Sequence, residues 1–224
     1  ASVNIFEGYF PFARQLGADI DGVTTDDGSG YSVSFNEDAT IMAIGANGDS
    51  YSGRVRVYQY LSGSWAQLGA DINGEAASDY SGHSVSLSSD GMTVAIGAHL
   101  NDGNGVDSGH VRIYNYNGTA WTQLGADING EAAYDYSGYS VSLSYDGKTV
   151  AIGAIYNDGV STNSGHVRVY NYLYGSWNQL GEDINGEVAY DNFGFSLSLS
   201  SDGNTLAVGA ISNDGNGDDS GHVR

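Results

Sequence analysis

Three segments of the chain carry oxygen-bearing side chains at one spacing, Asp-x-Asn-x-Glu-x-x-x-Asp. They are Asp71, Asn73, Glu75 and Asp79; Asp127, Asn129, Glu131 and Asp135; and Asp183, Asn185, Glu187 and Asp191. Calcium takes six to eight oxygen ligands, so four such side chains on one loop predict a calcium site. An earlier copy has Val23 in place of the Glu, which weakens the pattern. The alternative is that these side chains cap backbone amides in turns.

A second group of acidic residues lies in Gly-rich loops further along each copy. It comprises Asp102, Asp107, Asp158, Asp214 and Asp218. Loops of Gly, Asp and Asn either wrap a cation or simply turn, so Ca²⁺ is a candidate ligand here too. These loops differ most between copies, which makes them the expected specificity surface.

Aromatic residues and a sequon give two further candidate sites. Tyr134, Tyr156 and Tyr190 fall near the acidic loops, where tyrosine rings could bind a sugar. The alternative is that such rings cover the outer edge of the fold. Asn117-Gly118-Thr119 is an acceptor sequence for N-glycosylation, which matters only if the source glycosylates its proteins.

A histidine and an arginine two residues apart recur along the chain: His110 and Arg112, His166 and Arg168, His222 and Arg224. Arg54 takes the histidine position in the first copy. Residues two apart share one face of a strand. A recurring position is expected to serve packing, and the arginines are expected to pair with an Asp of a neighbouring loop. No nucleophile–base pair or phosphate loop stands out, so the sequence does not predict an enzyme.

Composition narrows the range of partners. The chain has 27 Asp and Glu against 7 Lys and Arg, a net charge of −20. Nucleic acid is therefore a poor partner, because phosphate needs a positive surface. With no Cys, disulfides and thiol chemistry are excluded. No apolar run approaches the roughly 18 residues of a membrane span.

These residues recur because a block of about 56 residues is repeated along the chain. In one copy, Ser84–Ser88 alternates polar and apolar residues, a turn at Asp90-Gly91 follows, and Thr93–Ala98 is nearly all apolar. Two more strands are expected at 110–116 and 121–124. Four antiparallel strands per repeat, here named A to D, are typical of a β-propeller blade, and a β-solenoid is the alternative.

The expected fold is therefore an all-β propeller with four blade equivalents in a single domain, residues 1–224. The repeats are approximately 17–68, 69–124, 125–180, and 181–224 together with 1–16. Residues 3–6 and 14–16 would be C and D strands, and the last repeat would supply A and B strands. One blade would then be closed by both termini. The alternative is that the chain is part of a larger propeller.

Ser-Gly-Tyr-Ser-Val, Ala-Ile-Gly-Ala and Gly-His-Val-Arg-Val-Tyr resemble the FG-GAP repeat of integrin-type β-propellers. They also resemble tandem repeats of microbial and algal surface proteins. Phe193-Gly194-Phe195 is the nearest copy. The resemblance implies an extracellular, adhesive or scaffolding role, often with calcium. In that family the calcium loop joins strands A and B, whereas here Asp90-Gly91 makes a tight turn with one carboxylate, so that site is not carried over.

The expected function is a non-catalytic, extracellular or cell-surface module for adhesion, scaffolding or assembly, with calcium as a candidate stabilising ion. Its partners would be other protein subunits or components of the cell surface or extracellular matrix. The alternatives are a carbohydrate-binding propeller, with glycans as partners, and a hydrolase or lyase with a carboxylate pair at the mouth of the pore.

Overall fold

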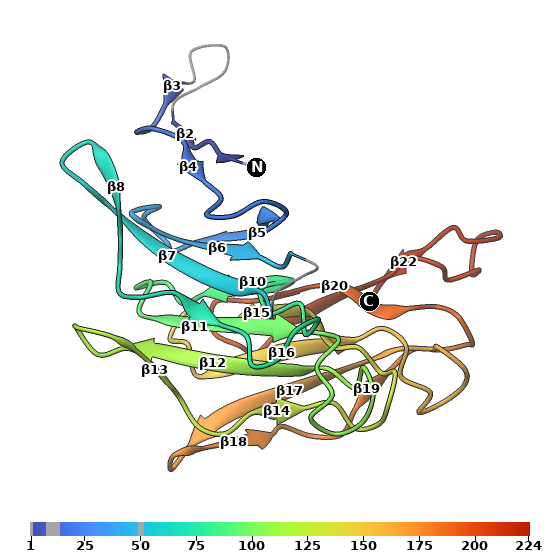
Figure 1. Cartoon of the computed structure of the whole chain (residues 1–224). Helices are drawn as coiled ribbons and strands as arrows, with labels where there is room; N and C mark the ends of the chain where they lie inside the picture. Colours follow the sequence, from blue (N-terminus) through green and yellow to red (C-terminus); the bar gives the residue numbers. More distant parts are fainter. Residues whose placement is uncertain (1, 8–13, 49–51) are drawn as a thin grey trace.

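The computed structural model describes residues 2–7, 14–48 and 52–224. Every regular element in these ranges is a β-strand, numbered β1 to β22 (Figure 1). The A strands are β5 (Ser29–Phe35), β10 (Ser84–Leu87), β15 (Ser137–Leu143) and β20 (Phe193–Leu199). The B strands are β6 (Ile41–Ala46), β11 (Thr93–Ala98), β16 (Thr149–Ala154) and β21 (Leu206–Ala210). No helix in the described part is long and apolar enough to cross a membrane.

The outer strands of each repeat complete the blade. The C strands are β7 (Arg54–Leu61), β12 (His110–Tyr116), β17 (His166–Leu173) and β22 (His222–Val223). The D strands are β8 (Ser64–Gln67), β13 (Trp121–Gln123) and β18 (Ser176–Gln179). Each D strand is followed by a short fifth strand, namely β9 (Ile72–Asn73), β14 (Ile128–Asn129) and β19 (Ile184–Asn185).

The fifth strand was not expected from the sequence. It pairs antiparallel with the first half of the C strand, as Val111 does with Ile128, while the D strand pairs with the second half, as Tyr114 does with Gln123. The blade edge therefore consists of two short strands in line. Asn129 and its equivalents consequently lie in the sheet and not in the loop that follows it.

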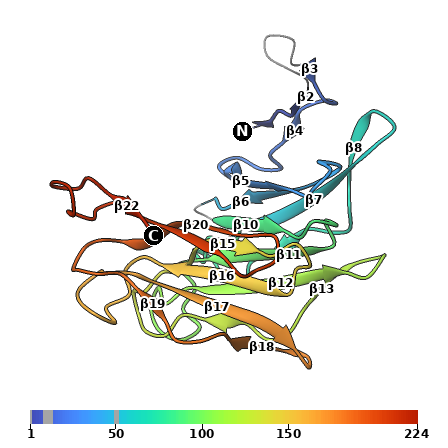
Figure 2. The ribbon, with the colours of Figure 1, turned by 180° about the vertical axis from the view of Figure 1, so that it is seen from behind.

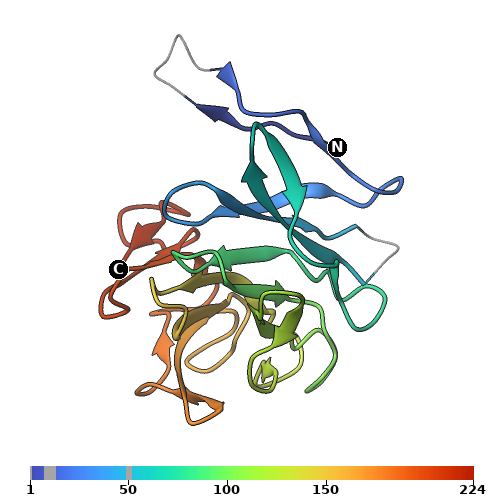
Figure 3. The same ribbon diagram turned by 90° about the vertical axis from the view of Figure 1, so that its left-hand side faces the viewer.

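Within the described residues, the two ends of the chain do not build one blade together. β1 (Ser2–Val3) pairs with β4 (Ile20–Asp21), and β2 (Phe6–Glu7) pairs with β3 (Arg14–Gln15). This is the C, D and fifth-strand pattern of a repeat, and it packs beside β5. At the other end, β21 pairs with its own C strand, β22. Figures 1 to 3 show β22 and the N-terminal strands on different sides of the molecule, so the expected closure by both termini is not seen.

The hydrophobic core is divided into layers between neighbouring blades. One layer holds Ile44 and Ile5, the next Val57 and Ile96, and the next Ile113 and Ile152. The B strands β6, β11 and β16 are buried at every residue. A strand with a sheet stacked on each side has no solvent face, which is why Ala-Ile-Gly-Ala is apolar throughout.

Close backbone approach explains the glycine of that motif. A Cβ atom on Gly97 would lie 2.0 Å from the carbonyl oxygen of Gly138 in the next blade. The hydroxyl of Ser84 donates to the same carbonyl over 2.8 Å, and Ser86 Oγ accepts from the amide of Leu143 over 3.0 Å. The small residues of strands A and B therefore hold successive blades together.

The recurring arginine and tryptophan make the outer contacts between blades. Arg112 donates to the carbonyl of Asn73 in the preceding blade over 2.9 Å, and its guanidinium lies 3.3 Å from Glu75. Trp121 Nε1 donates to the carbonyl of Leu68 over 2.7 Å. The packing role expected for the arginine is thus seen, but its acidic partner is a Glu and not an Asp.

Candidate functional site

Two sets of loops meet on one side of the blades. The D–A loops lead from the fifth strand of one repeat into strand A of the next, and the B–C loops join strands B and C. The amide of Tyr134, in a D–A loop, donates to the carbonyl of Val106, in the preceding B–C loop, over 2.8 Å. Asn104 of that B–C loop donates to the carbonyls of Gly130 and Glu131, each over 2.9 Å. These loops form one surface, called here the loop rim.

A buried Asp closes each D–A loop. Asp135 is 3% exposed, and its Oδ2 accepts from the amide of Ala132 over 3.0 Å and from Asn157 Nδ2 over 3.0 Å. Asn157 begins the B–C loop of the blade that Asp135 enters. Asp79 and Asp191 make the same bonds, to Asn101 and Asn213. The ninth position of the predicted calcium motif is thus a turn cap that clips two loops together.

The carboxylates of the B–C loops also bind their own backbone. Asp102 Oδ1 accepts from the amide of Asp107 over 2.8 Å, Asp158 Oδ1 from Asn163 over 2.7 Å, and Asp214 Oδ1 from Asp219 over 2.8 Å. Asp218 is exposed. Burial, followed by the nearby Asp102 charge, raises the pKa of Asp107. Here too the structure shows the capping arrangement.

The four positions of the predicted calcium motif do not converge within one loop. In the first segment Asp71 lies 3.4 Å from Arg54, Asn73 pairs with the backbone of Arg54, and Glu75 turns toward the C strand of the next blade. Asp79 binds elsewhere, as described above. The side chains that do meet come from successive copies of the motif: position five of one copy and position one of the next.

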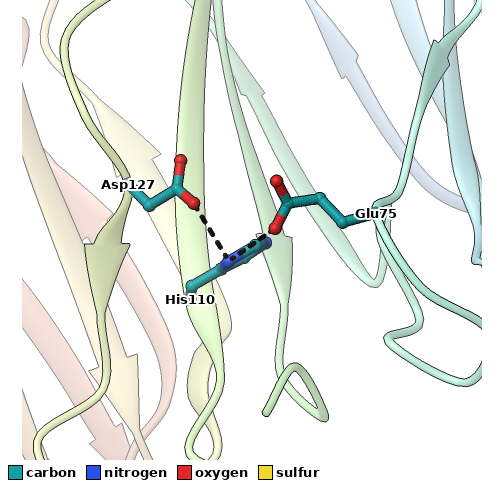
Figure 4. A group of neighbouring side chains, drawn as sticks. All are labelled: Glu75, His110 and Asp127. Carbon is teal, nitrogen blue, oxygen red and sulfur yellow. Dashed lines mark ion pairs between the residues drawn. The ribbon is translucent and has the colours of Figure 1, made fainter. Parts of the chain in front are cut away.

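These two carboxylates flank a buried histidine (Figure 4). His110 Nδ1 lies 4.0 Å from Glu75 Oε2 and 3.8 Å from Asp127 Oδ2. His110 is 1% exposed and its Nδ1 has no hydrogen-bond partner. The three ligand atoms lie within 4.8 Å of one another. β12 places the histidine, the D–A loop places Glu75, and the segment before β14 places Asp127.

The next repeat builds the same group. His166 Nδ1 lies 3.7 Å from Glu131 Oε2 and 3.9 Å from Asp183 Oδ2. Glu187 follows the pattern in the last repeat, where its Oε1 lies 3.2 Å from Arg224. Asn185 lies in β19, where it pairs with the backbone of His166. Within the described residues, then, two complete His-carboxylate groups recur one repeat apart.

Burial lowers the pKa of His110 and His166 to about 4 each, and the adjacent Arg112 or Arg168 adds to the shift. The nearby Asp127 and Asp183 oppose it with a smaller effect. Both imidazoles are therefore neutral at pH 7. A close His–carboxylate ion pair would need a charged ring, so these contacts are better described as a neutral ring facing two anions.

The three tyrosines considered for sugar binding lie on the loop rim. Tyr134 and Tyr190 are 58% and 61% exposed, and both have a φ of 68°. Tyr156 is 37% exposed and packs against Tyr136, with ring centroids 4.9 Å apart and ring planes tilted by 51°. A left-handed backbone is uncommon for a bulky residue. Asn117 is exposed at the C–D turn of its blade, where its Oδ1 accepts from Thr119 and Ala120.

An aromatic cluster that the sequence did not predict lies where the A strands begin. Tyr31, His83, Tyr139 and Phe195 occupy one repeat position, and neighbouring rings lie 4.7 to 5.2 Å apart. His99 adds a ring 3.9 Å from His83. In a propeller, equivalent positions on the innermost strands of successive blades converge on the central axis. An aromatic ring recurring at such a position is the sequence signal that could have predicted this cluster.

Both histidines of this cluster are uncharged at pH 7. Burial lowers the pKa of His83 to about 4 and that of His99 to about 3, where the neighbouring His83 adds to the effect. Besides each other, the rings facing His99 are those of Tyr80, Tyr136 and Tyr139, and those facing His83 are Tyr31 and Tyr139. No charged side chain is among these ring contacts in the described part of the chain.

At the other end of the A strands a hollow of about 250 Å³ is lined by Phe35, Leu87, Leu143 and Leu199. Glu37 is the one carboxylate among its described lining residues. The carboxylate pair considered for a hydrolase is therefore not assembled in this hollow.

Four-stranded antiparallel blades packed face to face, with connecting loops gathered on one rim, define a β-propeller module. The FG-GAP repeat family matches the chain over residues 72–114, 129–170 and 185–223, which is more than half of its length. The chain therefore belongs to the FG-GAP repeat family. A search among curated proteins found no similar sequence.

Solved structures of low sequence identity share the fold. The hydrazine synthase of Kuenenia stuttgartiensis aligns with a TM-score of 0.52 at 12% identity, over 90% of this chain and 45% of that one. A Bacteroides fragilis protein assigned as a 6-phosphogluconolactonase aligns with a TM-score of 0.54 at 14% identity, over 75% of this chain and 42% of that one. The chain thus spans less than half the length of these proteins, and the likeness concerns the fold alone.

Proposed function

We propose that this propeller is a non-catalytic adhesion or scaffolding module that acts outside the cell or at its surface and binds a protein partner through the loop rim. The observation that carries the proposal is a contrast within the rim. The bonds that hold the loops in place repeat from blade to blade, while the exposed side chains differ.

The repeated part is the hydrogen bond from Asn157 to Asp135 and its equivalents in the other repeats, called here the loop clip. The variable part lies beside it: Ser78 takes the position of Tyr134 and Tyr190, and Leu100 and Ser212 take that of Tyr156. A rigid frame that presents different side chains suits recognition, because little conformational entropy is lost on binding. Exposed tyrosines add contact area with a polar tip.

Charge indicates the kind of partner. The net charge is −20, and the rim loops carry carboxylates such as Glu131, Asp158 and Asp214. An acidic surface attracts cations and positively charged protein surfaces, and the attraction weakens as salt is added. Calcium is also a candidate stabilising ion for the B–C loops. There the negative charge of Asp102 is near enough to Asp107 to help raise its pKa. If it binds there, adding CaCl₂ raises the Tm and a chelator reverses the effect; an unchanged Tm removes calcium from the proposal.

The test is binding of the purified chain to immobilised panels of extracellular-matrix proteins at low and high salt. We expect salt-sensitive binding to at least one protein, lost in Tyr134→Ala/Tyr190→Ala. The matched control is Tyr174→Ala, which removes a fully exposed tyrosine at the C–D turn, at the opposite end of the strands. Absence of binding on the whole panel, or equal loss in the control, contradicts the proposal.

Carbohydrate binding is the second candidate, favoured by the exposed rings of Tyr134, Tyr156 and Tyr190. A glycan array probed with the same variants separates the two. Selective glycan signals that persist at high salt and disappear in the double variant would replace the protein partner by a sugar.

A further inference from the structure

We infer that the two His-carboxylate groups, Glu75/His110/Asp127 and Glu131/His166/Asp183, are binding sites for a divalent transition metal of the zinc class. This inference does not depend on the partner proposed for the loop rim.

The first argument is the environment of the histidine. His110 is 1% exposed, and its Nδ1 has no hydrogen-bond partner while two carboxylate oxygens face it at 3.8 and 4.0 Å. A protonated Nδ1 would be a buried donor without an acceptor in reach. A deprotonated Nδ1 would direct its lone pair at two anions. Both arrangements are costly for a buried ring nitrogen, and a cation between the three atoms resolves either.

The second argument is that each carboxylate is held with one oxygen free. Asp127 Oδ1 accepts from Gln123 Nε2 over 2.6 Å, and its Oδ2 faces His110. Glu75 Oε1 lies 3.3 Å from Arg112, and its Oε2 faces His110. Outer partners that orient the ligands are characteristic of built metal sites.

The second site repeats this arrangement atom for atom. Asp183 Oδ1 accepts from Gln179 over 2.7 Å, and Glu131 Oε1 lies 3.6 Å from Arg168. The other oxygen of each carboxylate faces His166. His166 is likewise 1% exposed with both ring nitrogens unpartnered.

The third argument is a substitution that the chain itself contains. In the first repeat Arg54 stands at the histidine position and Val23 at the glutamate position. Arg54 Nη1 lies 3.4 Å from Asp71 Oδ2, while Asp71 Oδ1 keeps its bond from Gln67. The carboxylate oxygen that faces the histidine in later repeats here faces a positive charge built into the chain. We read the guanidinium as the substitute for a bound cation.

The donor set selects the class of metal. One imidazole nitrogen and two carboxylate oxygens suit zinc and similar ions, whereas calcium prefers six or more oxygens. Tetrahedral zinc would bring its donors to about 3.4 Å from one another. The present separations of 3.7 to 4.0 Å from Nδ1 need only a small contraction.

The direct test is isothermal titration of the chelator-treated chain with ZnCl₂ and, separately, with CaCl₂. We expect zinc to bind at the two groups and to raise the Tm, and calcium not to compete for them. The decisive variant is Glu75→Val/His110→Arg, which copies the first repeat and is therefore compatible with the fold. It should lower the zinc stoichiometry by one per chain and leave the circular dichroism spectrum unchanged.

Two further variants test each site separately. Glu131→Val/His166→Arg should remove the second zinc. Asp127→Asn should weaken zinc binding at the first site at least tenfold, because the new side chain keeps an oxygen that accepts from Gln123 but loses the negative charge. Cobalt loaded at the sites should show the visible absorption of a four-coordinate ion. Absence of zinc binding, or a stoichiometry that both double variants leave unchanged, overturns the inference, and neither result bears on partner binding through Tyr134 and Tyr190.

Discussion

The side chain of Asn157 donates to Asp135 Oδ2 over 3.0 Å and joins the loop that enters a blade to the B–C loop of the same blade. The carboxylate is 3% exposed, and the amide of Ala132 is its second donor. One side chain therefore closes its own turn and fixes a neighbouring loop. The same pair recurs as Asp79 with Asn101 and Asp191 with Asn213.

Removal of this clip should destabilise the protein. Asp135→Ala leaves the buried side-chain amide of Asn157 and the partly buried backbone amide of Ala132 without their acceptor, which should lower the free energy of unfolding by about 1–3 kcal/mol. The control is Asp218→Ala, an exposed carboxylate of the same rim, which should change it by no more than about 0.5 kcal/mol. Urea unfolding measures both, and equal effects would show that the clip does not stabilise the loops.

Gly97→Ala should be strongly destabilising, because the new methyl group would meet the Gly138 carbonyl at 2.0 Å in the next blade. We expect the free energy of unfolding to fall by about 1–3 kcal/mol because the site is overpacked. Gly209 holds the same repeat position, but the nearest atom to its Cβ would be the hydroxyl of Ser196 at 2.6 Å, and the next two nearest described atoms also belong to Ser196 of its own blade. Gly209→Ala should therefore cost much less. Similar melting temperatures for the two variants would argue against blade contact at Gly97.

The aromatic cluster should make stability depend on pH. The pKa values of His83 and His99 are lowered to about 4 and about 3, whereas an unfolded histidine titrates near about 6.5. Between these values the unfolded chain binds more protons than the folded one, so stability is lost as the pH falls below about 6.5. His83→Tyr/His99→Ile copies Tyr139 and Ile155 of the next repeat and should make this dependence shallower. The part that stays comes from His110 and His166, whose pKa values burial also lowers to about 4. Melting curves from pH 7.5 to 4.5 provide the test, and parallel slopes for parent and variant would refute it.

Tyr134→Gly should separate stability from binding. Its φ of 68° is unfavourable for tyrosine and free for glycine, so the variant should fold with unchanged or slightly greater stability. Partner binding should nevertheless fall, because the exposed ring is gone. Tyr174→Gly, at a φ of 53° on the C–D turn, is the matched control that should keep binding. A large drop in Tm for Tyr134→Gly would show that the ring serves the fold.

The repeat made most of the fold predictable. The alternation in Ser84–Leu87 correctly predicted an A strand, because alternating residues indicate a strand with one buried face. The apolar run Thr93–Ala98 correctly predicted a B strand, because a strand buried on both faces is apolar throughout. The fifth strand was missed since Ile128 and Asn129 are only two residues within a segment rich in Asp and Gly. Its pairing is decided by the C strand beside it.

The site was less predictable because its parts belong to different copies of the motif. Asp127 and Glu131 are four residues apart on one loop, yet Asp127 faces His110 and Glu131 faces His166. A motif considered as one unit predicts convergence within the loop. Only the stacking of one repeat on the next shows which carboxylates meet at a histidine.

The contact of D–A and B–C loops on a single rim can be tested directly by disulfide cross-linking. Because the chain contains no cysteine, a disulfide can form only between the two cysteines that are introduced. The amide of Tyr134 bonds to the carbonyl of Val106 over 2.8 Å, and both side chains are exposed. Under mild oxidation Val106→Cys/Tyr134→Cys should form an intramolecular disulfide, detected by mass spectrometry after proteolysis, whereas Tyr134→Cys/Tyr174→Cys should not. Failure of the first pair, or equal cross-linking of the second, would contradict the shared rim.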